Sequence, residues 1–410
     1  MHRQTRTVTP ARSWQMQALI GLLVPIGLSL AGAGLLGLHP PSARANGLPP
    51  GEASDPTPTA TPDHTNTAPT LADFWNGTAT WALDKHEVGL PVGESDTVDM
   101  GNGIFWSYLH ASTSSAGITD SCGNAVSFPG CVTRWVSTDG GMTFSLPNST
   151  CLFACKTCPC AESDKTRQQQ YPRVVRAQSG TFYMVFEHDA EAWITRSNDG
   201  LNWVTPVGVA GTGLWNGDCI NAMKIGPHPF VESQLYDCMA GGPPGITIVG
   251  NNHLTVFTGF GQDPGHMGCF QSPGMTITGF HRCPMSVLFA GSPTYGPLEV
   301  TGGLDANPYF DFRYVTSADV IRVGDTYYMA YEGVRGPGVG ATRDTQFGLG
   351  FARSKIINTT WEEYPANPVL QDVSDNWGVG HADLLVVDGT TIMYTATPEL
   401  TRGRYVLVWK

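Results

Sequence analysis

The chain has 410 residues and a formal net charge of −12, with 49 glycines, 30 prolines and only 14% charged residues. An acidic chain without a basic patch is poorly suited to neutralise phosphates, which argues against nucleic acid as a partner. The acidity by itself indicates solubility and identifies no substrate.

The first 45 residues have the pattern of a secretory signal. Basic residues precede an apolar run from Ala18 to Leu38, and Ala43-Arg44-Ala45 places small residues at a signal peptidase site. We expect cleavage after Ala45 and a secreted protein. An uncleaved membrane anchor is the alternative, because the apolar run is near the length that spans a bilayer. Either reading puts the rest of the chain outside the cytosol.

Residues 46–70 are rich in proline, threonine and alanine. Such a composition cannot bury a core, so it predicts a stalk or linker between the signal and a domain at 71–410.

Ten cysteines suit an oxidising compartment. Four of them form the dense set Cys151, Cys155, Cys158 and Cys160, which also invites a metal interpretation. Because no histidine accompanies this set, we expect disulfides that close a long loop, with the partners left open.

One phrase recurs along the domain: an extended segment, a tight turn and an aromatic strand. Its copies begin at Asp96, Arg173, Ile246, Asp319 and Asp383. Short aromatic runs between turn residues are typical of strands, and the mature part lacks a sustained helical period. Repeats of about 70 residues that each hold two hairpins are blades of a propeller.

The sequence therefore predicts an all-β fold, a five-bladed β-propeller with four-stranded blades. The last repeat ends after three strands, so the segment 74–83 is expected to supply its fourth strand. This exchange closes the ring and leaves no free sheet edge.

A second element of the repeat is a strand that runs into a serine. In two copies the serine opens a turn, Ser137–Phe144 and Ser197–Trp203, in which Asp139 and Asp199 can bind their own turn backbone. The spacing Ser137-x-Asp-x-Gly-x-Thr-Phe144 resembles the Asp-box of sialidases and other propellers.

The last repeat resembles glycoside hydrolases of family 43. Trp377–Gly389 is similar to the Gly-x-Gly-His stretch in their last blade, and the blade phrase is similar to that of the five-bladed families 43, 32, 62 and 130. The resemblance covers about residues 74–410 and implies a glycosidase-like protein that binds an oligo- or polysaccharide.

In a propeller the starts of the innermost strands open into one central funnel. The repeat thus brings Asp96, Asp319 and Asp383 together, with Arg173 beside them. Glycoside cleavage uses one ionised carboxylate and one protonated carboxyl, and crowded acids raise each other's pKa. Arg173 could keep one neighbour ionised or grip a carboxylate of the substrate.

The family 43 resemblance implies an Asp base on blade one, a tuning Asp on blade two and a Glu acid on blade three. Asp96 fits the first place, whereas Arg173 and Gly245-Ile246 stand at the other two. Hydrolysis would then need substitutes, for which the candidates are Glu187, His188, Asp189, Glu332, Asp218 and Glu232.

The resemblance also implies that His381 helps to hold Ca²⁺ or ordered water on the axis. We expect that the protein requires no cofactor. A sialidase would instead use a Tyr–Glu pair and arginines, for which Tyr171, Arg313 and Glu332 supply the residue types. A propeller that only binds sugars is the third alternative, with Trp106 among the aromatic residues for stacking. We expect a monomer.

Overall fold

The computed structural model of the chain describes residues 67–111, 117–126, 130–160, 169–188, 191–209, 243–261, 266–283, 289–290, 310–311, 314–334, 347–371, 382–397 and 401–410. These residues lie in one compact unit, Thr67–Lys410. The helix within them is α1 (Leu71–Trp75), which is too short to cross a membrane. The apolar run 18–38 lies outside the described residues.

The strands follow in chain order. They are β1 (Ala79–Lys85), β2 (Ser95–Gly101), β3 (Ile104–Ala111), β4 (Cys131–Ser137), β5 (Gln170–Arg176), β6 (Phe182–His188), β7 (Glu191–Ser197), β8 (Val207–Gly208), β9 (Gly245–Val249), β10 (His253–Gly261), β11 (His266–Gln271), β12 (His281–Arg282), β13 (Phe289–Ala290), β14 (Tyr314–Val323), β15 (Thr326–Val334), β16 (Phe347–Ser354), β17 (Glu362–Glu363), β18 (Leu370–Gln371), β19 (Asp383–Val387), β20 (Thr390–Ala396) and β21 (Arg402–Trp409).

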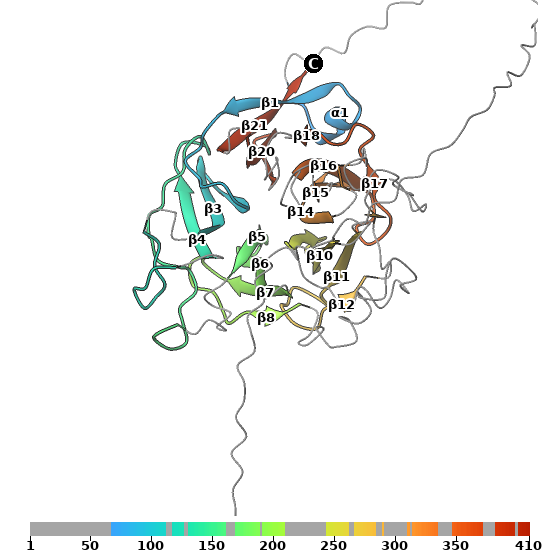
Figure 1. Ribbon diagram of the computed structural model, residues 1–410. Coiled ribbons are helices and arrows are strands. Elements are labelled where there is room, and N and C mark those ends of the chain that lie inside the picture. The colour runs from blue at the N-terminus through green and yellow to red at the C-terminus, as the bar shows by residue number, and fades with distance from the viewer. Residues whose placement is uncertain are drawn as a thin grey trace, which may run out of the picture. The chain divides into compact units, whose positions relative to one another are not determined.

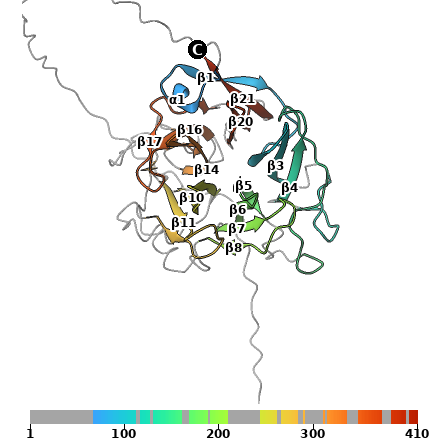
Figure 2. The same ribbon diagram turned by 180° about the vertical axis from the view of Figure 1, so that it is seen from behind.

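Five strands surround a common axis, and each carries one copy of the repeat. They are β2, β5, β9, β14 and β19, and each contacts the next along the chain while β19 contacts β2. The antiparallel sheets that extend outward from them stand in a ring (Figure 1, Figure 2). The predicted five-bladed β-propeller is therefore confirmed.

The blades contain three or four antiparallel strands. Blade one is β2-β3-β4, blade two is β5-β6-β7-β8, and blade five is β19-β20-β21-β1. Blade three is built on β9-β10-β11 and blade four on β14-β15-β16, each with short outer strands. Blades three and four also join into one sheet, because β10 pairs with β14 at Phe260↔Val315.

The N-terminal strand closes the ring as expected. β1 pairs antiparallel with β21, from Ala79↔Trp409 onward. The strand starts later than the sequence suggested, because Phe74 and Trp75 belong to α1. A reciprocal cap stabilises this helix: Asp73 N donates to Thr70 Oγ1, and Thr70 N donates to Asp73 Oδ2 over 2.8 Å.

The apolar core is divided among the blade boundaries, with one cluster at each. This explains why the aromatic second strands are buried on both faces, as β6 is along its whole length. Representative pairs of cluster members are Tyr108 and Phe182 between blades one and two, Val185 and Val256 between two and three, Phe257 and Met329 between three and four, Phe351 and Met393 between four and five, and Phe105 and Tyr394 between five and one.

The serine turns form as the sequence predicts. Asp139 Oδ1 accepts from Thr143 N over 2.9 Å, and Asp199 Oδ1 accepts from Asn202 N over 2.7 Å. Burial acts to raise the pKa of Asp139, but hydrogen bonds from Thr143 and Ser137 lower it to about 2. Each turn therefore has an ionised carboxylate that satisfies its own backbone.

These turns also connect neighbouring blades. The Tyr394 hydroxyl of blade five donates to Gly141 O of blade one over 2.8 Å, and the Tyr108 hydroxyl of blade one donates to Gly200 O of blade two over 3.0 Å. Both tyrosines occupy second strands, so the same contact is repeated at two boundaries.

The cysteines of the described residues are all paired, which confirms the disulfide interpretation. Cys219 and Cys238 lie outside these residues. The pairs are Cys122–Cys158, Cys131–Cys151, Cys155–Cys160 and Cys269–Cys283.

We predict that Gly141→Ala destabilises the ring by about 2–4 kcal/mol. Gly141 has a φ of +82°, and a Cβ there would overlap the Tyr394 hydroxyl and the Phe105 ring. Gly140→Ala is the matched control, because Gly140 has a φ of +74° but nothing within 4 Å of its would-be Cβ. Urea denaturation should show the larger loss for Gly141→Ala; equal losses would contradict the contact with Tyr394.

Candidate functional site

Three aspartates from three blades meet on the propeller axis. Asp96 of β2, Asp319 of β14 and Asp383 of β19 each place a carboxylate oxygen within 4.8 Å of the others. All three side chains are buried. The repeat therefore brings together the acids that the sequence placed at the funnel. Together with Arg173 we call them the axial cluster.

Each axial aspartate also binds the backbone of the next blade. Asp96 Oδ2 accepts from Val174 N, and Asp319 Oδ2 accepts from Leu384 N. Asp383 Oδ1 accepts from Thr97 N over 3.1 Å. In every case the donor is the residue that follows the matching repeat position, so the carboxylates link the innermost strands around the ring.

Arg173 connects several blades across the axis. Its Nη1 donates to Ser95 O over 2.9 Å and to Ala382 O over 2.7 Å. Its Nη2 donates to Ser317 Oγ over 2.8 Å and lies 3.4 Å from Glu94 Oε2. Both terminal nitrogens are engaged by the protein and Nε is buried, so Arg173 offers no accessible donor to a substrate carboxylate.

The axial carboxyls hold protons more strongly than ordinary aspartates. Burial raises the pKa of Asp96 well above its usual value, and the charges of Asp319 and Asp383 raise it further. Burial also raises the pKa of Asp319 to about 6, although Arg173 opposes the change. The pKa of Asp383 is raised by burial against the effect of Arg402.

A second group of polar side chains interacts beside the axial cluster. The pKa of Tyr171 is raised well above its usual value by burial, and then by the charges of Glu187, Glu94 and Glu332. The phenol is therefore protonated at neutral pH. We call Glu94, Tyr171, Glu187 and Glu332 the mouth group, because two of them precede axial residues at the start of the innermost strands.

Irregular backbone at the starts of the innermost strands positions Glu94 and Tyr171, each two residues before an axial residue. Glu94 precedes β2, and register shifts interrupt β5 between Gln170 and Arg173 and β14 between Thr316 and Asp319. Ser317 stands at the same place before Asp319, and its hydroxyl donates to Glu94 Oε2 over 2.6 Å. Tyr171 and Ser317 both have positive φ values, +53° and +55°.

Arg402 of β21 lies between the two groups and is fully buried. Its Nη2 donates to Ser95 Oγ over 2.8 Å. Within the described part of the chain, its Nε and Nη1 have no hydrogen-bond partner. Burial lowers its pKa to about 10, and the charges of Asp383, Glu94 and Glu332 oppose this change.

The remaining predicted residues are placed as follows. His188 is buried beside Trp193, with the ring centroids 6.2 Å apart. Trp106 lies between blades one and two, where its ring stacks on Phe182 and the Arg134 guanidinium sits 4.3 Å from the ring centre. It is therefore a packing residue at a blade boundary. Arg313, His381, Asp189, Asp218 and Glu232 lie outside the described residues.

Blade three contributes no acid to the axis at its repeat position. The repeat residue is Ile246, whose buried side chain packs in the core between blades two and three. A Cβ on the preceding Gly245 would overlap the carbonyl oxygen of Ala318 on β14, so the close approach of blades three and four requires glycine there.

Sequence reasoning missed Glu94, Ser317 and Arg402. Strand alternation gave no signal for the first two, because Glu94 precedes β2 and Ser317 lies at a register shift in β14. Arg402 had no signal either, since it lies on β21, the third strand of blade five.

The axial aspartates do not fit a Ca²⁺ site well. Ca²⁺ takes about six to eight oxygen ligands. Here the three carboxylates already accept backbone N–H groups and interact with the cation of Arg173. A proton and a guanidinium therefore suit this cluster better than a second cation.

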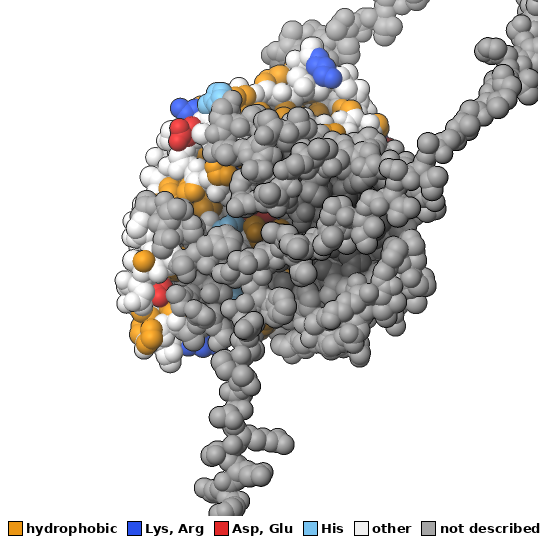
Figure 3. All heavy atoms as spheres, viewed as in Figure 1, with side chains coloured by type: hydrophobic (Ala, Val, Ile, Leu, Met, Phe, Trp, Pro, Cys, Tyr) orange, Lys and Arg blue, Asp and Glu red, His pale blue; other side chains and the backbone are white. Residues whose placement is uncertain are grey.

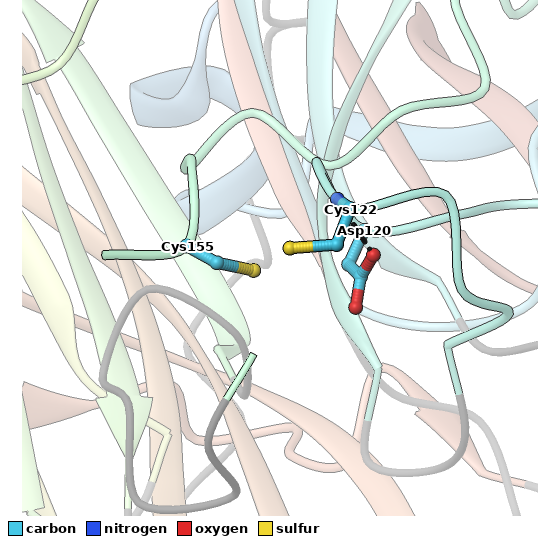
Figure 4. Close-up of side chains that lie close together, drawn as sticks. All are labelled: Asp120, Cys122 and Cys155. Atoms are coloured by element: carbon cyan, nitrogen blue, oxygen red, sulfur yellow. Dashed lines mark hydrogen bonds between the residues drawn. The ribbon is translucent and has the colours of Figure 1, made fainter. Parts of the chain in front are cut away.

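Asp120, Cys122 and Cys155 also place potential metal ligands within 4.8 Å of one another (Figure 4). Both sulfurs belong to disulfides, Cys122–Cys158 and Cys155–Cys160. Metal binding by cysteine requires a thiolate, so this group is not a metal site in the oxidised protein.

The described part of the face seen in Figure 3 carries few lysine and arginine side chains, and these are scattered. It shows no basic stripe of the kind that tracks a nucleic acid backbone.

No protein-family model matches the chain, and no curated protein matches it either. Solved structures do match. A proposed glycoside hydrolase from Parabacteroides distasonis is 15% identical with a TM-score of 0.51, over 77% of this chain and 86% of that chain.

Two further structures give lower scores. A family 43 protein (subfamily 12) from a capybara gut metagenome is 12% identical with a TM-score of 0.47, over 83% of this chain and 55% of that chain. The α-L-arabinanase of Cellvibrio cellulosa, complexed with arabinohexaose, is 12% identical with a TM-score of 0.45, over 78% of this chain and 93% of that chain. The chain therefore shares its propeller fold with the Parabacteroides distasonis structure.

We predict that Arg173→Met destabilises the protein by about 3–5 kcal/mol, because it leaves several buried carboxylates without their cation. The matched control is Arg353→Met, which breaks the 2.9 Å pair with the exposed Glu362 and the contact with the Trp75 ring, and should cost about 1–2 kcal/mol. Urea denaturation measures both. Similar losses for the two variants would contradict a central role for Arg173.

We predict that the stability of Asp319→Asn rises relative to that of the wild type as the pH rises. The wild-type pKa is about 6, above the ordinary value of 3.8. The stabilisation that protonated Asp319 gives the folded state is thus fully present below pH 3.8 and is lost as the pH rises through about 6. Asparagine can still accept from Leu384 N but never ionises.

Thermal unfolding of both proteins between pH 4.5 and pH 8 tests this prediction. The stability difference should change in favour of Asp319→Asn by on the order of 2 kcal/mol. A difference that does not vary with pH would show that Asp319 does not titrate in this range.

Proposed function

We propose that the protein is a glycosidase that acts on an extracellular carbohydrate through the mouth group. The observation that carries this proposal is the contact of Glu94 with Ser317 and Arg173, in a group where the charges of Glu94, Glu187 and Glu332 act on Tyr171. Glycoside cleavage needs two carboxyl groups in different protonation states. The axial aspartates are engaged in linking the blades, which leaves the glutamates as the reacting groups.

Glu94 suits the ionised role. Arg173 Nη2 lies 3.4 Å from its Oε2, and the Ser317 hydroxyl donates to the same oxygen over 2.6 Å. A nearby cation and a donated hydrogen bond both favour the charged carboxylate. Glu94 would then act as the base that activates water or as the nucleophile at the anomeric carbon.

Glu187 suits the role of proton donor. Glu94 and Glu332 both interact with the charge of Arg402, which favours their ionised forms. Glu187 is buried, and its charge acts on Tyr171 together with those of Glu94 and Glu332. Carboxylates crowded in a buried site favour a proton on one of them. Its proton would pass to the glycosidic oxygen as the bond breaks, while Tyr171 donates a hydrogen bond within the same site.

Several features support an extracellular setting. Four disulfides occur among the described residues, and such bonds persist in oxidising compartments. The basic and apolar N-terminal pattern is that of an export signal. The Parabacteroides distasonis structure supports a glycosidase through its fold.

We predict that wild-type protein releases sugar from at least one member of a glycan panel that includes arabinans, xylans and sialosides. Glu94→Gln and Glu187→Gln should each lower kcat by about 10²-fold or more, because each removes a proton-transfer or nucleophilic group. Glu362→Gln is the matched control, since Glu362 is 58% exposed on the outer edge of blade four.

Other outcomes would redirect the proposal. Binding of a glycan without release would identify a carbohydrate-binding propeller. Loss of activity in Asp96→Asn but not in Glu94→Gln, with both variants folded by circular dichroism, would indicate that the axial cluster carries out the reaction.

A further inference from the structure

Two disulfides lie side by side, with one cysteine from the segment before β4 and three from the segment after it. The Sγ atoms of Cys122 and Cys155 are within 4.8 Å of each other, and Figure 4 shows them pointing toward one another. Their bonded partners are Cys158 and Cys160 respectively. A sulfur released from one disulfide would therefore lie next to the other.

The two disulfides differ in exposure from the remaining pairs. Cys158 is exposed, and Cys122 and Cys155 are half-buried. By contrast, Cys131–Cys151 and Cys269–Cys283 are buried at both sulfurs. Thiol–disulfide exchange needs access to a sulfur, so an external thiol reaches the Cys122–Cys158 bond first.

Asp120 places negative charge beside Cys122. Its Oδ1 accepts from Cys122 N over 2.8 Å and from Asn124 N over 2.9 Å, and one of its oxygens belongs to the 4.8 Å group with both sulfurs. Like charges repel, so a thiolate on Cys122 is disfavoured here. The equilibrium of exchange therefore favours Cys122 within a disulfide over Cys122 as a free thiolate.

We propose that these four cysteines form a thiol–disulfide exchange site that relays the attack of an external thiol from Cys158 to Cys160. The external thiolate bonds to Cys158 Sγ, the Cys122–Cys158 bond breaks, and its electron pair leaves on Cys122. Cys122 then bonds to Cys155 Sγ, the Cys155–Cys160 bond breaks, and the electron pair leaves on Cys160, which takes a proton.

The products are a mixed disulfide at Cys158, a new Cys122–Cys155 bond and one thiol at Cys160. One external thiol enters and one protein thiol appears, so no further oxidant or reductant is required. Cys122 remains in an internal disulfide, but its partner changes from Cys158 to Cys155. This site does not depend on the proposed glycosidase activity.

Reduced glutathione is the probe for the test. The folded full chain is incubated with it at millimolar concentration, quenched with acid, unfolded and alkylated, and then mapped by peptide mass spectrometry. We expect glutathione on Cys158, alkylation on Cys160 and a Cys122–Cys155 crosslink. These should form about tenfold or more faster than any reaction at Cys131–Cys151.

Two variants make the relay falsifiable. In Cys155→Ser/Cys160→Ser the thiol should remain on Cys122 and be alkylated there. If that variant does not fold, Asp120→Asn serves instead, and it should move part of the alkylation from Cys160 to Cys122. Alkylation of Cys122 in the wild type would overturn the relay. Equal reactivity of the buried Cys131–Cys151 pair, or no reaction at Cys158, would overturn the site itself.

Discussion

The guanidinium of Arg173 is the contact on which the centre of this propeller depends. It donates to backbone or side-chain oxygens of blades one, four and five while it belongs to blade two. The aspartates around it would repel one another without a cation between them. A buried ion group is weak evidence for stability, but removing one partner from it is strongly destabilising. Arg173 therefore fixes how four blades meet at the axis.

Polar links at matching repeat positions order the rest of the ring. Axial carboxylates accept from the next innermost strand at three boundaries, and second-strand tyrosines bind the serine turns at two. Apolar packing between blades is less directional, so these hydrogen bonds define the relative position of neighbouring sheets. The same hydrogen bonds therefore also determine the geometry of a site that lies between blades.

The fold could be predicted from the sequence because each copy of the repeat is a short continuous stretch with an aromatic strand and a glycine turn. The convergence of Asp96, Asp319 and Asp383 followed from that repeat. Their bonding to backbone amides did not, because a carboxylate that links strands and one that meets substrate have the same sequence pattern. Glu94 could not be placed from strand alternation, because it precedes β2 and the matching residues of β5 and β14 lie at register shifts. Arg402 could not be placed either, because it lies on the third strand of blade five and acts on Asp383 only in the folded sheet.

The pairing of β1 with β21 has a consequence for how the molecule folds. These strands hold Ala79 opposite Trp409, so their contact has almost the largest sequence separation that the domain allows. Contacts between distant residues form slowly, because the chain entropy of closing the loop must be overcome before the contact stabilises anything. During synthesis β1 must wait unpaired until the last blade is complete. Ring closure is thus a late event in folding, and the open ring before it exposes two unpaired strand edges.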